Sequence, residues 1–377
     1  MIKLSRHCVL VHMKLVFLGT ASCFPTARRG VSCIALRLEK DGSIWLFDCG
    51  EGSQIQLQKS SIRPGKITKI FITHLHGDHL FGLPGLICTL SSQCSFKPDF
   101  ILEIFGPQGL RQYVRQSLNL SRSPLPFQYM VHELVPVAHQ YPKDWGNWTV
   151  DHDAHGPLHP QEILGRQIEA ESDVWTLIPG CQESHAVLAG PLQHRIPCFG
   201  FVVQEPSVNG KLDVEKFAAL GGKPGPECAL LKKGTTITLL SGAVIKPSDV
   251  IGPPQPGRKI VILGDTCNSD KMKQIASKCD VLVHEATLEN AMEENALEKG
   301  HSTPDMAATF AQLVEARMLI LNHFSQRYQH DITLEMGPGP ELLAVEAREK
   351  LGEDSSCKVV VADDLLEICI PRPHPAH

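Results

Sequence analysis

The chain has 377 residues, of which 42% are hydrophobic and 20% charged, and its formal net charge is −5. This composition excludes a disordered chain. The length predicts two domains or one large layered domain with insertions, because single-core domains rarely exceed about 250–300 residues. No apolar run reaches the roughly 18 residues that a membrane-spanning helix needs. The acidic balance also means that a nucleic-acid partner would have to meet local basic patches or metal ions.

Apolar runs bounded by turn residues predict the strands, and apolar periodicity near 3.6 residues predicts the helices. After a loose N-terminal extension at residues 1–12, we expect strands at residues 15–18, 33–38, 44–47, 67–72, 101–105, 130–135, 193–203, 259–263, 280–283, 318–321, 359–362 and 366–370. The expected helices are residues 53–59, 80–90, 110–118, 214–220, 289–297, 307–316 and 341–351. The segment 139–184 is poor in either pattern, so we predict a surface insertion there.

A dense group of potential metal ligands follows the strand at residues 67–72, in the sequence Thr73-His74-Leu75-His76-Gly77-Asp78-His79. Two neutral imidazoles suit one Zn²⁺, and an imidazole with a carboxylate suits a second. Gly77 is expected to allow a tight turn that lets the two pairs of ligands face different ways. Earlier in the chain, Asp48 ends a strand and is predicted either to orient a metal-bound histidine or to cap the helix at residues 53–59.

Other candidate ligands also stand at strand ends. They are His194 (with His185 as the second choice), Asp265 and His323. Sites in layered α/β proteins form where strands end, and an aspartate there can bridge two metals through its two oxygens. The predicted ligand sets are His74, His76, His194 and Asp265 for one Zn²⁺, and Asp78, His79, His323 and Asp265 for the other.

Residues 204–236 interrupt the strand pattern with five lysines and a Gly-Pro-rich stretch. Composition alone favours a solvated loop, and the alternative is a basic excursion that clamps a polyanion. The residues that would make such a contact are Lys223, Gly225, Pro226, Lys232 and Lys233. The thirteen cysteines occur without paired spacing, which favours a reducing compartment.

Several longer motifs go beyond a generic metal site. They are Phe17-Leu18-Gly19-Thr20, Phe47-Asp48-Cys49-Gly50-Glu51, His194-Arg195-Ile196-Pro197, Gly264-Asp265-Thr266, His284-Glu285-Ala286-Thr287, Gly300-His301-Ser302-Thr303 and His323-Phe324-Ser325-Gln326-Arg327-Tyr328. With these motifs the chain resembles the metallo-β-lactamase fold superfamily and, within it, the short form of ribonuclease Z, the tRNA 3′-processing endonuclease of the zinc phosphodiesterase ELAC type. The likeness extends over nearly the whole chain from about Met13.

The resemblance implies an α/β fold with four αββα layers over residues 13–377, two zinc ions per chain and a homodimer. It implies that residues 204–236 are a protruding arm that grips precursor tRNA, rather than the solvated loop that composition favours. The 3′ trailer would be removed with a 3′-hydroxyl left on the tRNA, in the cytosol and also in the nucleus. One stretch departs from the family, because Pro25-Thr26-Ala27-Arg28-Arg29-Gly30 replaces a PxKxRN-like loop.

The expected mechanism follows from charge, because in-line attack of water on a phosphodiester adds negative charge to its oxygens. Asp78 is predicted to hold or receive the proton of the nucleophile. His301, kept cationic by Glu285, is predicted to protonate the leaving 3′ oxygen, although the turn at residues 300–303 would equally suit a capping role. The candidate phosphate contacts are Arg28, Arg29 and Arg327, and Arg327 would equally suit a structural ion pair.

Two other classes of function share part of this pattern. One is a different hydrolase on the same metals, such as a thioesterase of glyoxalase II type, a β-lactamase-like enzyme or a diesterase for small substrates. The other is a nucleic-acid-binding protein that has lost catalysis. The motif His284-Glu285-Ala286-Thr287 argues against the first two enzymes. The full set of ligands with both acid–base candidates argues against the binding protein.

Overall fold

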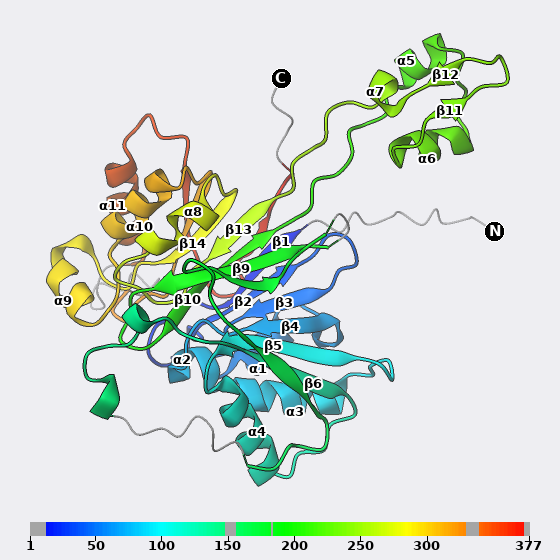
Figure 1. The fold of residues 1–377 in the computed structure, drawn as a ribbon. Coiled ribbons are helices and arrows are strands. Elements are labelled where there is room, and N and C mark those ends of the chain that lie inside the picture. The colour runs from blue at the N-terminus through cyan, green and yellow to red at the C-terminus, as the bar shows by residue number, and fades with distance from the viewer. Residues whose placement is uncertain (1–12, 148–155, 182–183, 329–338, 373–377) are drawn as a thin grey trace, which may run out of the picture. The chain divides into compact units, whose positions relative to one another are not determined.

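The computed structural model describes residues 13–147, 156–181, 184–328 and 339–372 (Figure 1). Within these residues, two compact units are distinguished. The main unit is formed by residues 13–179, 187–203 and 259–370, and the second unit by residues 180–186, 204–258 and the C-terminal residues from Pro371. None of the described helices is long and apolar enough to cross a membrane.

Two mixed sheets form the centre of the main unit (Figure 1). The first has the order β17-β1-β2-β3-β4-β5-β6-β7, in which the pairs from β17 to β3 are antiparallel and those from β3 to β7 are parallel. Its strands are β1 (Lys14–Gly19), β2 (Cys33–Arg37), β3 (Ile44–Phe47), β4 (Ile67–Phe71), β5 (Ile101–Pro107), β6 (Gln128–Leu134), β7 (Glu162–Ile168) and β17 (Glu367–Cys369).

The second sheet has the order β16-β15-β14-β13-β10-β9-β8. The pairs from β13 to β16 are parallel, and β8 pairs with β9 in the antiparallel sense. Its strands are β8 (Trp175–Ile178), β9 (Ala186–Leu192), β10 (Cys198–Gln204), β13 (Lys259–Ile262), β14 (Val281–Glu285), β15 (Met318–Asn322) and β16 (Lys358–Val361).

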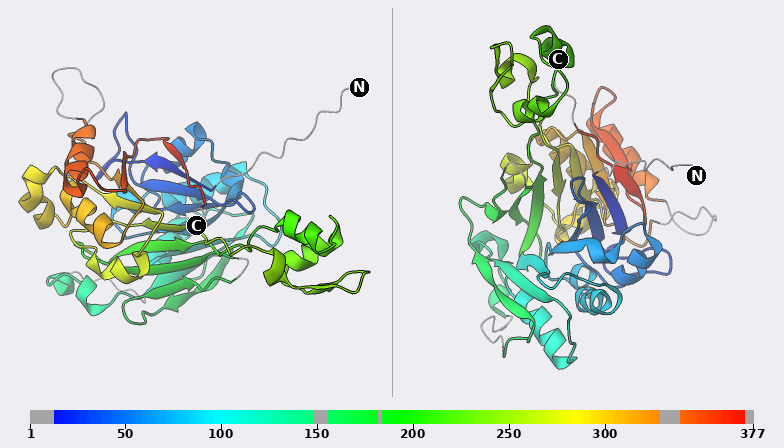
Figure 2. Two further views of the ribbon diagram at one scale, coloured as in Figure 1. Left: turned by 90° about the horizontal axis from the view of Figure 1, so that it is seen from above. Right: turned by 90° about the vertical axis from the view of Figure 1, so that its right-hand side faces the viewer.

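Helices cover the outer faces of the two sheets, which gives the predicted αββα layers (Figure 2). The helices of the main unit are α1 (Ser53–Lys59), α2 (Gly77–Leu80), α3 (Leu83–Gln93), α4 (Leu110–Leu120), α8 (Lys273–Ala276), α9 (Glu293–Glu298), α10 (Pro304–Leu313) and α11 (Glu341–Leu351). The short 3₁₀ turns are Pro64–Lys66, Ala138–Gln140, Trp145–Asn147, Asp270–Met272 and Asn290–Met292.

The strand that carries the histidine motif is fixed from both sides. Side chains alternate between the two faces of a strand, so Phe71 faces the opposing sheet while Ile70 packs with the helices behind. The Phe71 ring stacks on Phe47 and Phe105 with centroids 5.0 and 5.1 Å apart, and meets Phe201 of β10 at 5.5 Å. Burial of each ring contributes about 1.5–3 kcal/mol to the stability of the fold. This packing anchors the end of β4, from which the histidine motif continues.

The predicted surface insertion at residues 139–184 is wrong where this segment supplies β7 and β8 to the two sheets. Because β7 contains several polar side chains, it lacks the apolar run that would predict a strand. Glu162 pairs with Arg115 of α4 at 2.7 Å, and Gly165 accepts a hydrogen bond from Arg111. The ion pair replaces the apolar contacts that usually mark a strand, and its partner lies in a distant helix.

The second unit has a small hydrophobic core of its own. It contains α5 (Val214–Ala219), α6 (Pro226–Lys232), β11 (Ile237–Thr238), β12 (Val244–Ile245) and α7 (Pro247–Val250). The core residues are Phe217, Leu231, Ile237, Ile245 and Val250. Backbone hydrogen bonds between Val208 and Gln255 close the base of the unit at 2.9 and 3.0 Å. The predicted arm at residues 204–236 lies in this unit, which continues to Arg258.

Candidate metal centre and active site

Asp48 fixes the loop that carries the histidine motif. Its carboxylate accepts hydrogen bonds from the Thr73 backbone N–H at 2.7 Å and the Thr73 hydroxyl at 2.9 Å, and lies 2.7 Å from His79 Nδ1. Asp48 has a φ of 60°, a left-handed conformation that costs a non-glycine residue free energy and is common at functional sites. The alternative capping role is wrong, because Gly52 is the N-cap of α1.

The conformation of Gly77 does not itself require glycine, because its φ is not left-handed. The close approach of a neighbouring ring explains the glycine better than the predicted tight turn does. A Cβ atom at this position would lie only 2.3 Å from the ring of Phe81. A side chain at position 77 would therefore require the exposed Phe81 ring to move.

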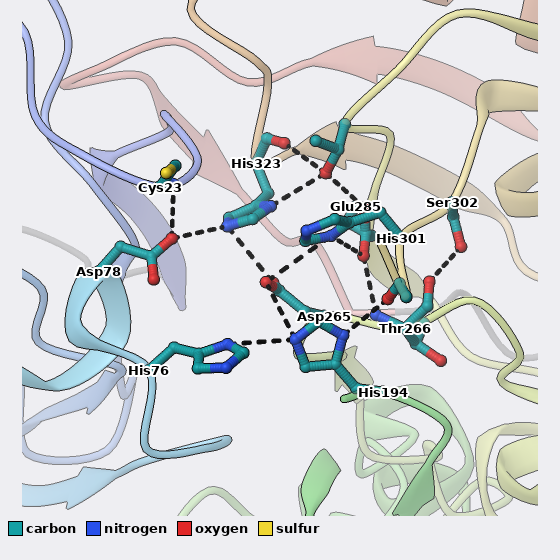
Figure 3. A network of polar contacts seen from close by, with 12 residues as sticks. Cys23, His76, Asp78, His194, Asp265, Thr266, Glu285, His301, Ser302 and His323 are labelled. Carbon is teal, nitrogen blue, oxygen red and sulfur yellow. Dashed lines mark hydrogen bonds and ion pairs between the residues drawn. The ribbon is translucent and has the colours of Figure 1, made fainter. Parts of the chain in front are cut away.

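The first cluster of candidate ligands consists of His74, His76, His194 and Asp265. His76 Nδ1 lies 3.1 Å from His74 Nε2 and 3.2 Å from His194 Nε2. Asp265 Oδ2 lies 3.7 Å from His74 Nε2 and 4.0 Å from His194 Nε2. Figure 3 shows His76, His194 and Asp265 converging from different segments of the chain.

The second cluster consists of Asp78, His79, Asp265 and His323. His79 Nε2 lies 3.2 Å from His323 Nε2, 3.3 Å from Asp265 Oδ1 and 3.6 Å from Asp78 Oδ2. His323 Nε2 lies 3.3 Å from Asp78 Oδ2 and 3.4 Å from Asp265 Oδ1. Asp265 therefore turns one oxygen to each cluster. Within the described residues, neither cluster includes His185, the second choice to His194.

The ring nitrogens that face away from the clusters have partners of their own. His194 Nδ1 donates to the Gly300 carbonyl at 2.7 Å, and His323 Nδ1 lies 3.1 Å from the Thr287 hydroxyl. These contacts leave His194 Nε2 directed at the first cluster and His323 Nε2 directed at the second. Tetrahedral ligand atoms around zinc, at bonds of about 2.0–2.1 Å, lie roughly 3.4 Å apart, so both donor sets fit a metal ion.

The electrostatics of the two clusters also suit a cation. Burial lowers the pKa values of His74 and His194, and lowers that of His76 to about 4, so these imidazoles are neutral as metal ligands must be. Burial opposes a charge on His79, but the carboxylates of Asp265, Asp78 and Asp48 outweigh it and raise the His79 pKa. The negative potential that favours a proton there equally favours a divalent cation in its place.

Glu285 and His301 form a pair that, with His323 of the second cluster, makes a third group of potential ligands (Figure 3). His301 Nδ1 lies 3.0 Å from Glu285 Oε1, which also accepts the Thr266 backbone N–H at 2.8 Å. Burial lowers the His301 pKa, but the charge and hydrogen bond of Glu285 outweigh it and raise the pKa to about 9. The predicted pairing is thus present, with His301 Nδ1 also 3.8 Å from Asp265.

A cavity of about 640 Å³ opens over this group of residues. Asp78, Asp265, His301 and His323 all contribute to its lining, and so does the predicted phosphate contact Arg327. The lining also includes two exposed cations that sequence reasoning missed, Arg195 and Lys299. Their positions in the sequence could have indicated them as cavity residues. Arg195 directly follows the candidate ligand His194, and Lys299 lies two residues before His301.

The paired arginines of the loop at residues 25–30 have different environments. Arg28 is exposed, whereas Arg29 is buried. Arg29 donates to the Thr20 hydroxyl at 2.7 Å and lies over the Phe324 ring at 5.5 Å. The prediction of a phosphate contact is wrong for Arg29, because its guanidinium is engaged inside the fold.

The predicted contacts of the arm lie in the second unit, and each is exposed: Lys223, Gly225, Pro226, Lys232 and Lys233. Gly225 is the N-cap of α6, and Pro226 is its first residue. The Gly-Pro pair therefore begins a helix, which the sequence patterning did not predict, and Lys232 lies in its last turn.

Comparison with known proteins agrees with the geometry. The family model described as Anti-Pycsar protein Apyc1 matches residues 13–124. Zinc phosphodiesterase ELAC protein 1 from Bos taurus is 44% identical over 95% of this chain and 99% of its own length. Ribonuclease Z from Bacillus licheniformis is 38% identical over 86% of this chain and 92% of its own length.

The crystal structure of human tRNase Z, short form (ELAC1), aligns with 95% of this chain and 100% of that chain, with a TM-score of 0.64 and 37% identity. The likeness thus extends over nearly the whole of both chains. The chain belongs to the short-form ribonuclease Z family of zinc phosphodiesterases, hydrolases on the metallo-β-lactamase fold.

Proposed function

We propose that this protein is a zinc-dependent endoribonuclease that removes the 3′ trailer from tRNA precursors and leaves a 3′-hydroxyl on the tRNA. The observation that carries the proposal is the pair of ligand clusters joined by Asp265 at an open cavity. The names of the relatives, ribonuclease Z and tRNase Z, support the RNA substrate.

Two zinc ions per chain would be held by the two clusters. His74, His76, His194 and Asp265 would hold one ion, and Asp78, His79, Asp265 and His323 the other. When bound, such ions supply a water molecule of lowered pKa and offset negative charge on the phosphate oxygens.

Asp78 is the residue that we assign to the proton of the attacking water. Its Oδ2 accepts the Cys23 backbone N–H at 2.6 Å, which holds the carboxylate at the cavity. Burial raises the Asp78 pKa, but His79 and His323 outweigh it and lower the pKa below its usual range. An ionised carboxylate of low pKa orients a water by accepting its hydrogen bond, and is a weak store for the proton.

His301 is the residue that we assign to the leaving 3′ oxygen. With a pKa raised to about 9 by Glu285 against the effect of burial, the imidazole carries a proton at neutral pH. Its ring lines the same cavity as Asp78, and the two residues come from opposite halves of the chain. A proton donor and a water-orienting carboxylate thereby line the same cavity.

The decisive experiment is incubation with a 3′-extended tRNA precursor, followed by mapping of both new ends. We expect one cut after the acceptor stem and a 3′-hydroxyl on the tRNA. A chelator should abolish cleavage, and added zinc should restore it. A 2′,3′-cyclic phosphate end, or cleavage that resists the chelator, would contradict the proposal.

We also propose a homodimer in the cytosol and nucleus. The thirteen cysteines occur without paired spacing in the sequence, which supports a reducing compartment. Light scattering on the purified protein tests the dimer, and a mass of one chain would exclude it.

A further inference from the structure

One wall of the cavity carries an exposed aromatic ring. Phe81 follows α2, is 62% exposed, and lines the cavity together with Asp78 and His301. A single exposed apolar residue is normal on a protein surface. Phe81 differs because its ring is part of the cavity that holds the reactive groups.

The Phe81 ring packs against the backbone at Gly77, the residue before Asp78. The Phe81 ring lies so close to Gly77 that a Cβ there would be 2.3 Å from Cε2 and 2.5 Å from Cδ2. Gly82 in turn packs on Gly50, where a Cβ would lie 2.0 Å from the carbonyl oxygen. The backbone after Phe81 is thus closely packed, and one side of the ring lies against Gly77 while most of it is open to solvent.

The cavity lining combines cations with the aromatic ring of Phe81. Arg195, Lys299 and Arg327 come from three segments in the second half of the chain and suit the phosphates of an RNA backbone. Phe81 and Glu51 line the same cavity, and the residues next to them, Gly82 and Gly50, are in backbone contact. The cations suit phosphate, whereas a neutral flat base suits the aromatic ring.

We propose that Phe81 is the stacking platform for the nucleobase adjacent to the cleaved phosphodiester. This inference rests on the proposed ribonuclease function and names how the cavity holds its RNA. Stacking on an aromatic ring tolerates every base, because each has a flat π face, so Phe81 would fix the position of the nucleotide without reading its identity.

The test uses the full-length zinc-loaded protein and three precursors of one tRNA. One is unmodified, one has an abasic ribose immediately 5′ of the cleaved bond, and one has it immediately 3′. We expect wild-type kcat/KM to fall roughly tenfold to hundredfold for one of the two abasic precursors. Phe81→Leu should lose a similar factor on the unmodified precursor and cut that abasic precursor as wild type does.

Phe81→Tyr is the matched control, and it should retain wild-type rates on all three precursors. The inference is overturned if wild type cuts both abasic precursors normally, or if Phe81→Leu lowers the rates on all three precursors by the same factor. A wild-type protein that cuts none of them would overturn the proposed ribonuclease function itself, a result distinct from a loss of base dependence.

Discussion

Among single residues, Asp265 has a special position, because its two oxygens face two different sets of imidazoles. Oδ2 lies 3.7 Å from His74 Nε2, and Oδ1 lies 3.3 Å from His79 Nε2. The carboxylate is buried, with its pKa held well below the usual range by neighbouring histidines that outweigh the effect of burial. Removing it leaves both donor sets one ligand short.

We therefore predict that Asp265→Ala loses both zinc ions and all cleavage of precursor tRNA. The control is Asp48→Asn, which keeps every ligand atom and alters the group that holds His79 Nδ1 and Thr73. That change should weaken one zinc about 10–100-fold and leave the other in place. Metal analysis after dialysis measures both, and two zinc ions per chain in Asp265→Ala would refute the bridging assignment.

His301→Ala should lower single-turnover cleavage about 10²–10⁴-fold, as expected for a lost proton donor, with the zinc content unchanged. Glu285→Gln keeps a hydrogen-bonding group beside His301 but removes the charge that raises its pKa, so its loss should be smaller. Zinc loss from His301→Ala would instead identify this histidine as a ligand.

His132 provides a prediction about stability and pH that is independent of the metal centre. Its Nδ1 accepts the Arg166 backbone N–H at 3.1 Å, and its ring stacks on Phe105 at 4.5 Å. Burial, and to a smaller extent Arg166, Lys69 and Arg111, lower its pKa to about 4. The unfolded chain therefore binds the extra proton first, so the free energy of unfolding falls as the pH drops from about 6.5 towards 4.

We expect His132→Gln to reduce this acid sensitivity by about 1–2 kcal/mol, as judged by urea unfolding at pH 7 and pH 4.5. His139→Gln, at an exposed position, is the control and should behave as wild type. An equal loss of stability in all three proteins would rule out His132 as the source.

At the scale of elements, the segment after β15 holds the loop after β1 against the cavity. Gln326 Nε2 donates to the carbonyls of Ser22 and Phe24, and Ser22 N–H donates to the Phe324 carbonyl at 2.9 Å. Between them, Cys23 has a φ of 70° and presents its N–H to Asp78. The strained residue is therefore held from one side and hydrogen-bonded to the proposed water-orienting carboxylate on the other.

Gln326→Ala should release this loop and lower kcat about tenfold with little change in zinc content, because the orientation of Asp78 is lost and its ligand atom is not. Gln312→Ala in α10 removes another side-chain amide that donates to backbone carbonyls and serves as the control. A rise in KM alone would show that Gln326 contacts RNA instead.

The local pattern of apolar residues was sufficient to predict elements whose buried residues recur regularly. The helices α1 and α11, for example, have the predicted bounds. The strand ends that deliver His74, Asp265 and His323 were likewise predictable, because apolar runs stop where the ligands begin. Arg29 was not, because its partners Thr20 and Phe324 come together only in the fold. Pairwise contacts between distant segments leave no periodicity in a single sequence.

On the scale of the whole molecule, the two connections to most of the second unit pair with each other at its base. Most of this unit can therefore be deleted and the chain rejoined by a short turn. Val208 and Gln255 are paired as an antiparallel bridge, and a two-residue turn spans such a pair. Below this bridge, Glu205 pairs with Arg258 and Arg372, which keeps the base of the unit intact.

We predict that replacing residues 209–254 with Asn-Gly abolishes cleavage of precursor tRNA and preserves hydrolysis of bis(4-nitrophenyl) phosphate. The two ligand clusters and the cavity belong to the main unit, whereas the exposed lysines of the proposed arm would be gone. Phe217→Asp, which disrupts the small core without shortening the chain, should have the same effect. Parallel loss of both activities would mean that the second unit is needed for the fold of the site.

The pairing of His79 with His323 at 3.2 Å spans 244 residues of chain, and this separation sets the timing of metal loading during synthesis. At about 5–20 residues per second, a ribosome needs roughly 10–50 s to proceed from one histidine to the other. During that interval the emerging chain exposes the histidines of residues 74–79 without Asp265 or His323. A nascent chain therefore competes poorly for cellular zinc, and its capacity to cut RNA arises only late in its production.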